Sequence, residues 1–439
     1  MIRAISLSIV QIDYKWAKVR KMKNTSMKQK KLLIFGGNAL ACDIVRTAKE
    51  MGIYTIVTDW YPPSQSVAKL ISDEAWDVSV TAYDELSSRV RKEGIDGILT
   101  GYSDSYMIPY QHLCEITGKP CYVTKPQLEW TMDKVLFKAK CREYGVPVVP
   151  EYELDSFDRT SIDRFHKVII KPADNSGSRG ICICDNAGDF EGMMEYALSF
   201  SEKKKLVLER YMDCDDVSFE YKLQDGRAML SSICDRYIYK TPHDGSVTSC
   251  LVYPSKYMDI YLSDVDRKVR GMFEKEGLKN GLLFMQAFVE DGHFFFYEMG
   301  FRLSGGRHYI FTNNQNKDNG LEQLVRFAIS GKMSDHRLEE TVNPKFKDLC
   351  CQLSVICRSE RIAEIEGWEK IGQMEQVIDV NRIFNVGDVV GKQGTTASIF
   401  ARIHLVVKRP DELRSIIDHI YGVLKVLNEK GENLVIRCV

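Results

Sequence analysis

Short apolar runs alternate with segments of helical periodicity near the start of the chain, and this alternation limits the fold more than any other feature of the sequence. Residues 31–35 (KLLIF) form an apolar run, a helical pattern follows over residues 38–51, and a second cycle ends in the apolar run IDGILT at residues 95–100. Strands that alternate with helices form a parallel sheet whose faces the helices cover. We therefore predict an α/β domain over residues 29–125.

Two glycines follow the first predicted strand and raise the question of a dinucleotide site. The run from Gly36 reads GGNALA, so it lacks the GxGxxG spacing that brings a backbone turn against a pyrophosphate. We interpret Gly36 and Gly37 as a tight turn where the next helix packs on its strand. A nicotinamide-dependent oxidoreductase stays as an alternative, which binding of NADH would support.

Length and charge limit the classes of partner. A chain of 439 residues is too long for one core, since domains usually contain roughly 100 to 200 residues. Its formal net charge of -1 provides no basic field for nucleic acid or an anionic membrane, and no run approaches the roughly 18 apolar residues of a membrane span. We predict small-molecule partners, with neither nucleic acid nor membrane among them.

Cysteine usage and the N-terminus both indicate a cytoplasmic protein. The 13 cysteines are scattered and include no CxxC pair, so neither a disulfide framework nor a zinc site fits them. In residues 1–28 a short apolar patch precedes the Lys and Arg residues, which is the reverse of a signal peptide. We interpret this stretch as a loosely ordered extension and Met27 as an alternative start.

The first stretch that could take part in a reaction has a lysine at the end of a predicted strand. In VIIKPADNSGSRGI, the strand ends in Lys171, and a loop with Ser176, Gly177 and Gly180 follows. Small residues let backbone N–H groups approach a phosphate, and the ammonium group supplies charge. An ordinary flexible hairpin loop would have a similar composition, so this stretch alone does not establish a phosphate site.

The second stretch is LVLERYMDCDDVSF, in which an apolar strand ends in Glu209 and an acidic cluster at Asp215 and Asp216 follows. Such an edge can offer backbone groups to an adenine and a carboxylate to ribose hydroxyls. A solvated acidic turn is the simpler interpretation of this stretch by itself.

The third stretch, residues 282–306, is the most informative. Two β-prone runs flank Asp291 and Gly292, which predicts a hairpin. Gln286 and Glu298 would share a face of that hairpin only with a three-residue turn or one bulge, and a metal site requires this arrangement. A carboxylate in the apolar run FFFYEM costs several kcal/mol unless a cation compensates it. Either a metal or Arg302, four residues later, could be that cation.

Two further segments complete the organisation. The stretch TMDKVLFKAKCREYGVP has helical period from Thr131 and ends at Gly145 and Pro147. Beyond about residue 340, strand-like runs surround one helical pattern at residues 410–427. We interpret this last part as a separate α+β or β-rich cap.

Taken together, the three stretches resemble the ATP-grasp superfamily, which includes biotin carboxylase, the large subunit of carbamoyl phosphate synthetase and bacterial L-amino-acid ligases. Order, spacing and residue types match over roughly residues 30–330. The resemblance implies a Rossmann-like preATP-grasp domain at residues 29–125 and a two-lobed ATP-grasp domain at residues 126–340, with its small lobe at about 150–215. Residues 341–439 would form the C-terminal cap.

The resemblance also implies roles for individual residues, with ATP and Mg²⁺ or Mn²⁺ as the bound groups. Gln286 departs from the commoner acid, although carbamoyl phosphate synthetase domains also have glutamine there, and Gly300 stands where the family usually has an asparagine that holds a second magnesium. The implied phosphate ligands are Lys134, after Asp133, and Lys171, with Ser176, Gly177 and Gly180 in the flap. The adenine would be met by Glu209, Arg210, Tyr211 and Met212, and the ribose by Asp216. The metal would be held by Gln286 and Glu298, and the reacting groups would be contacted by Arg302 and Lys171.

The activity implied is an ADP-forming ligase that activates a carboxylate as an acyl phosphate and joins it to an amine. A bicarbonate-using carboxylase or carbamoyl phosphate synthetase-like enzyme is one alternative, and a catalytically degenerate ATP-binding protein is another. The chain could assemble as a homodimer. Candidate residues on the acceptor side are Arg236, Lys240, His243, Arg307 and His308.

Overall fold

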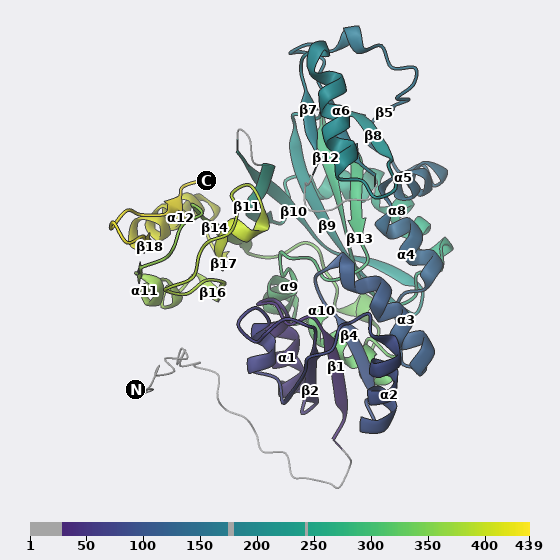
Figure 1. The fold of residues 1–439 in the computed structure, drawn as a ribbon, viewed down its shortest axis with the longest axis vertical. Coiled ribbons are helices and arrows are strands. Elements are labelled where there is room, and N and C mark those ends of the chain that lie inside the picture. Colours follow the sequence, from purple (N-terminus) through teal and green to yellow (C-terminus); the bar gives the residue numbers. More distant parts are fainter. Residues whose placement is uncertain (1–28, 174–179, 242–244) are drawn as a thin grey trace.

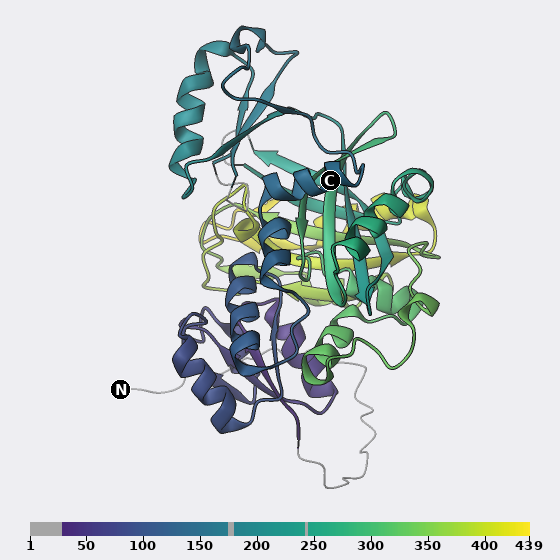
Figure 2. The same ribbon diagram turned by 90° about the vertical axis from the view of Figure 1, so that its right-hand side faces the viewer.

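The computed structural model describes residues 29–173, 180–241 and 245–439. The structure has three main parts, which are a parallel sheet near the N-terminus, a small antiparallel sheet and a long antiparallel sheet (Figures 1 and 2). Among the described residues, no helix is both long and apolar enough to cross a membrane.

The N-terminal part confirms the predicted parallel sheet. Its four strands run parallel in the order β3-β2-β1-β4. Gly36 has a φ of +76°, and a Cβ atom on Gly37 would lie 2.0 Å from the Ser66 Oγ, so both glycines belong to a tight turn. The elements are β1 Lys31–Phe35, α1 Ala41–Glu50, β2 Tyr54–Thr58, β3 Glu74–Trp76, α2 Tyr83–Glu93, β4 Gly97–Thr100 and α3 Met107–Thr117.

Two helices lead from this part to the small sheet, where the sequence predicted a single helical segment from Thr131. The chain breaks between α4 Lys125–Met132 and α5 Lys134–Glu143. Asp133 lies at the break as the N-cap of α5, and its carboxylate accepts hydrogen bonds from the backbone N–H groups of Val135 (2.9 Å) and Leu136 (3.2 Å). Such a cap satisfies backbone donors that a helix start leaves unpaired.

The small antiparallel sheet has the order β5-β8-β6-β7 and lies at the top of Figure 1. One helix covers it, and the two share a hydrophobic cluster of their own that includes Ile170, Phe190 and Leu208. The elements are β5 Glu151–Tyr152, β6 Val168–Pro172, β7 Cys182–Cys184, α6 Phe190–Ser199 and β8 Leu206–Arg210.

The long sheet begins with the order β13-β12-β9-β10-β11. The simpler interpretation of Asp215 and Asp216 was a solvated turn, but both lie on β9, and Arg236 lies on the neighbouring β10. Asp216 and Arg236 are register partners, so charges of opposite sign meet inside the sheet. The elements are β9 Asp215–Gln224, β10 Arg227–Thr241, β11 Gly245–Tyr253, α7 Met258–Asp264, α8 Asp266–Lys275, β12 Gly281–Glu290, β13 His293–Gly300, α9 Tyr309–Asn316 and α10 Gly320–Ser330.

The C-terminal part is joined to this sheet, because β11 pairs with β14 and the order continues to β17 and β16. It still has a separate hydrophobic cluster around Phe400 and Ile403. The N-terminal part and strands β9, β10, β12 and β13, in contrast, share one cluster. The elements are β14 Leu349–Cys357, β15 Glu364–Glu366, α11 Trp368–Gly372, β16 Val377–Arg382, β17 Ile399–Val407, α12 Leu413–Val423, β18 Lys425–Leu427 and β19 Val435–Ile436.

Candidate functional site

Lysines from two separate segments meet around one buried glutamate on the small sheet. Glu209 on β8 is 2% exposed, and one of its carboxylate oxygens lies 2.6 Å from the Lys171 Nζ on β6. Its other oxygen pairs with Lys138 of α5, which also pairs with Glu151. The sequence analysis missed Lys138, although its position one helical turn after Lys134 was a usable signal.

The electrostatics of this cluster place Lys134 close to Lys171. Burial lowers the pKa of Lys171, and the positive charges of Lys138 and Lys134 add to this effect while Glu209 opposes it. For Glu209, burial acts to raise the pKa, but the two lysine charges outweigh it and lower the pKa below its usual range. The structure therefore brings the two predicted phosphate lysines into one positively charged cluster.

The predicted flap is only partly described. Ser176 and Gly177 lie outside the described residues. Gly180 has a φ of +75°, and a Cβ atom there would lie 2.7 Å from the Phe200 Cβ and 2.9 Å from the Pro172 Cγ. Both the positive φ and the close packing therefore favour glycine at position 180.

The predicted adenine hinge makes contacts with the long sheet. The Arg210 guanidinium lies 2.6 Å from the Glu290 carboxylate and also donates to the Met212 sulfur. Lys240 lies 5.6 Å from the centre of the Tyr211 ring and donates to the Tyr211 hydroxyl at 3.1 Å. Lys240 therefore lies against the hinge, not on a separate acceptor side; His243 lies outside the described residues.

The predicted hairpin contains the bulge that a shared metal face requires. Gln286 and Glu298 are direct cross-strand partners, and the register shifts just beyond Gln286. Tyr297 is the extra residue, its ring stacks on Phe288 with centroids 4.6 Å apart, and its hydroxyl reaches the Gln286 Oε1 at 3.0 Å. The bulge thus sets two oxygen-bearing side chains next to each other.

An ion pair on the same sheet face adjoins these two residues. The Arg236 guanidinium donates to both oxygens of Asp216, at 2.9 and 3.0 Å, and the Tyr297 hydroxyl also reaches Asp216 at 3.1 Å. Burial raises the pKa of Asp216, and the charge of Arg236 opposes that rise. Arg236, which we had assigned to the acceptor side, belongs instead to the surroundings of Asp216, because the two are register partners on β9 and β10.

Glu298 and Arg302 do not form the structural pair that was the alternative to a metal site. Arg302 donates to Asp104 of the N-terminal part through two N–H groups, at 2.5 and 2.7 Å. Across residues 29–173, 180–241 and 245–439, the Glu298 carboxylate has no recorded hydrogen bond or ion pair. A partly buried carboxylate without a partner is suited to a cation.

Gly300 makes room for an aromatic ring. A Cβ atom at position 300 would lie 2.5 Å from the Phe284 Cε1, and the Arg302 guanidinium lies 5.0 Å from the centre of the same ring. The ring of Phe284 therefore occupies the space into which an asparagine at position 300 would extend.

Replacing Gly300 by asparagine is expected to lower the free energy of unfolding by about 1–3 kcal/mol, because the new side chain overlaps the Phe284 ring. Denaturant unfolding would measure the loss. Combining Gly300→Asn with Phe284→Leu should recover part of it. A single variant as stable as the unmodified protein would contradict this account.

The loop after β13 links the N-terminal part to the C-terminal part. Arg307, with a φ of +54°, donates to Asp43 of α1 at 2.7 Å and also pairs with Asp379 of β16. His308 is fully buried, with its Nδ1 3.3 Å from a Glu220 carboxylate oxygen, so it does not face a substrate as we had suggested.

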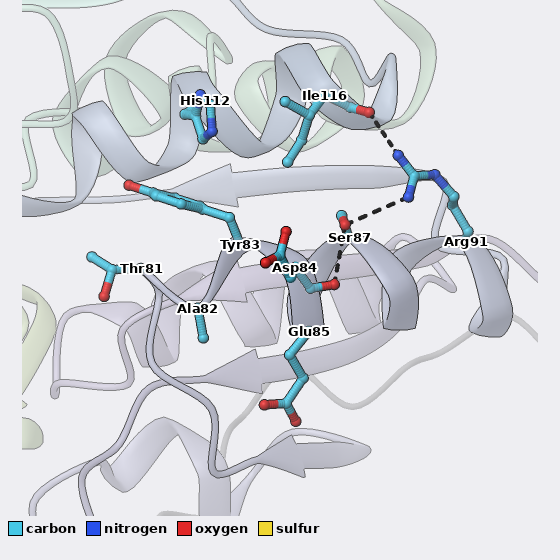
Figure 3. A pocket seen from close by; sticks show the side chains of 9 residues that line it. All are labelled: Thr81, Ala82, Tyr83, Asp84, Glu85, Ser87, Arg91, His112 and Ile116. Carbon is cyan, nitrogen blue, oxygen red and sulfur yellow. Dashed lines mark hydrogen bonds between the residues drawn. The ribbon is translucent and has the colours of Figure 1, made fainter.

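A surface hollow of about 760 Å³ lies elsewhere, between α2 and α3. Tyr83 packs edge-on against His112 there, with ring centroids 4.4 Å apart (Figure 3). None of the residues discussed above lines this hollow, so it is not part of the candidate site.

Comparison with known proteins identifies the architecture. No model of a protein family matches the chain. The small subunit of 2-oxoglutarate carboxylase from Hydrogenobacter thermophilus is 26% identical over 209 residues, which covers 42% of this chain and 43% of that protein. The matched region thus spans less than half of this curated relative.

Two solved structures match almost the whole chain. The L-amino acid ligase from Bacillus licheniformis has a TM-score of 0.75 at 16% identity, covering 92% of this chain and 100% of that one. The biotin carboxylase domain of the Hydrogenobacter thermophilus 2-oxoglutarate carboxylase, solved with Mg-ADP, ADP and bicarbonate, has a TM-score of 0.71 at 18% identity, covering 91% of each chain. Because both are ATP-grasp enzymes and match from the parallel sheet to the C-terminal strands, this chain has the ATP-grasp fold.

Proposed function

We propose that this chain is an ADP-forming ligase that phosphorylates a carboxylate with ATP and joins the acyl group to an amine. The observation that carries the proposal is the pairing of the buried Lys138 and Lys171 with Glu209, with Lys134 near enough to Lys171 for its charge to act on it. Lysines from α5 and from the end of β6 supply positive charge next to the predicted flap, as binding of a triphosphate requires. The ligase and the biotin carboxylase among the structural neighbours support the same class of chemistry.

The residues on the hairpin fit a magnesium ion. Gln286 and Glu298 offer neighbouring oxygen atoms, and Glu298 has no recorded protein partner within the described ranges. No cluster of three or more His, Cys, Asp or Glu side chains suited to a metal occurs among the described residues, which agrees with Mg²⁺, since this ion keeps several waters and needs few protein ligands. When bound, magnesium would neutralise phosphate charge. The Phe284 ring fills the space that an asparagine at position 300 would need. We therefore expect this hairpin to form one metal site and not two.

In the proposed reaction a substrate carboxylate oxygen attacks the γ-phosphorus of ATP, and the bond to the departing ADP breaks. The amine nitrogen then attacks the acyl carbon, and inorganic phosphate leaves as the amide forms. Lys134 and Lys171 would hold the phosphates, and Arg302, fixed by Asp104, would orient the carboxylate. Positioning and charge provide most of the acceleration in phosphoryl transfer, so no protein nucleophile is needed.

A second function has one observation in its favour, because the curated relative is a subunit of a carboxylase. In that function bicarbonate would take the place of the carboxylate. ADP release that depends on bicarbonate and on no other carboxylate would support it, whereas nucleotide binding without any ADP release would support a non-catalytic ATP-binding protein.

An ADP-release assay over panels of carboxylates and amines tests the main proposal. With a substrate pair found in this way, Lys171→Met and Glu298→Ala are each expected to reduce turnover about 100-fold or more. Lys171→Met removes a positive charge next to the phosphates, and Glu298→Ala removes a ligand of the magnesium that would neutralise them. Lys268→Met on the exposed face of α8 is the control and should keep normal turnover. Full turnover in either site variant would refute the assignment.

A further inference from the structure

Arg402 on β17 carries a buried guanidinium for which the described residues provide no counter-ion. Its exposure is 8%, and no hydrogen bond or ion pair of its side chain is recorded within the part of the chain that the structure describes. Arg302 and Arg307, two further arginines near the site, are each bound by a carboxylate. Among the residues that the structure describes, Arg402 thus differs from both in having no such partner.

The position of Arg402 in the sheet shows which way its side chain extends. His404, two residues along β17, lies 3.2 Å from the Asp379 carboxylate and 3.4 Å from the Gly306 carbonyl oxygen. Alternate residues of a strand point to the same face, so Arg402 also faces the loop that contains Gly306. On β16, directly opposite Arg402, Asn381 has a buried side-chain oxygen without a hydrogen-bond partner.

The surroundings of Arg402 come from three parts of the chain. Arg307, Tyr102 and Tyr309 lie close enough to influence its charge. Tyr102 follows β4 of the N-terminal part, and its hydroxyl lies 2.8 Å from that of Tyr309. Burial, with the charge of Arg307, lowers the pKa of Arg402 to about 10, so the guanidinium stays protonated at neutral pH.

An isolated buried charge costs several kcal/mol, which a protein usually avoids by pairing it. A ligand that supplies an anion next to Arg402 would offset this cost. We propose that Arg402 binds a carboxylate of a substrate, with the Asn381 amide beside it, where the N-terminal part, the loop at residues 303–309 and the C-terminal sheet meet. The proposal rests on the ligase function above and adds a requirement for the substrate.

The carboxylate bound by Arg402 is not the one that is phosphorylated. Arg302 lies close enough to Glu298 for the two charges to interact, which places Arg302 on the reacting side. Arg402 lies beyond the loop, on the side of Arg307 and His404. One of the two substrates therefore carries a carboxylate that stays unreacted.

The charges nearby favour a carboxylate over a phosphate ester. Asp379 occupies the next same-face position to Asn381 on β16, and Asp43 joins it around Arg307. Two aspartates would repel a dianion more strongly than a monoanion.

Thermal unfolding of the full chain with Mg-ADP tests the proposal. The carboxylate probes are acetate, L-alanine and succinate, and the phosphate ester is glycerol phosphate. Each probe is compared with sodium chloride of equal ionic strength. We expect at least one carboxylate to raise the Tm of the unmodified protein. Arg402→Leu should abolish that shift. The control Arg409→Leu removes an exposed guanidinium from the residues just after β17 and should keep it.

A second readout separates ligand binding from folding. Without any probe, Arg402→Leu should unfold at the same or a higher temperature than the unmodified protein, because it removes an unpaired buried charge, and its affinity for ADP should stay within twofold. Two results with Arg402→Leu would overturn the proposal: a lower Tm without any probe, or a carboxylate shift equal to that of the unmodified protein. Two results with the unmodified protein would also overturn it: no shift with any carboxylate, or a shift with glycerol phosphate alone. Failure of the unmodified protein to bind ATP or ADP would instead overturn the proposed function.

Discussion

Replacing Glu209 by alanine is expected to lower the free energy of unfolding by about 3–5 kcal/mol, since it leaves two buried ammonium groups without the carboxylate that they share. The side chains of Lys138 and Lys171 are 0% and 8% exposed, so water cannot replace the lost partner well. Chemical denaturation monitored by circular dichroism would measure the change.

The chain offers a matched control for this experiment. Glu290 also forms an ion pair, with Arg210 at 2.6 Å, but the two side chains are 40% and 37% exposed. Glu290→Ala should therefore cost less than about 1 kcal/mol. Equal losses for Glu209→Ala and Glu290→Ala would show that the lysine cluster does not depend on the buried carboxylate.

The stability of the protein is expected to fall between pH 6 and pH 8 through Glu220. Burial raises the pKa of this carboxyl group to about 8, against the opposing charges of Arg302 and Lys222. The native state therefore keeps a proton that the unfolded state has lost above about pH 4.5. Stability from this group is full below the unfolded pKa and declines as the pH rises to the folded pKa, by about 1.4 kcal/mol for each pH unit.

Glutamine at position 220 keeps the shape of the neutral acid and cannot ionise, so Glu220→Gln should remove this part of the pH dependence. The difference in unfolding free energy between the two proteins, followed from pH 6 to pH 9, should grow and then level off above about pH 8. Glu429→Gln, at an exposed position, serves as the control. A difference that does not change with pH would show that Glu220 is ionised throughout.

Several features could be predicted from the sequence because they depend on residues close together in the chain. The parallel sheet followed from the alternation of apolar and helical segments, and helical periodicity predicted a helix over the residues of α5, although not the break at Asp133. The hairpin with Gln286 and Glu298 on one face followed from turn residues and from the requirement for a bulge. The predicted roles of these residues in binding phosphate and metal stay predictions.

Contacts between distant segments could not be predicted in the same way. Lys138 and Glu209 are 71 positions apart and Arg302 and Asp104 are 198 apart, so nothing local in the sequence links them. Arg236 was assigned to the acceptor side because the residues around it in the sequence do not reveal Asp216 on the neighbouring strand.

Local periodicity and residue type determined that this chain contains a helix-covered parallel sheet, a lysine before a small-residue loop, and a hairpin with an embedded carboxylate. The tertiary structure alone decided which charges are paired, through strand register and the packing of the N-terminal part against the loop after β13. The same packing gives Arg402 no carboxylate partner among the described residues. The physical reason is that a charge in a low-dielectric interior is controlled by neighbours within a few ångströms in space, and most of those neighbours lie far away in the chain.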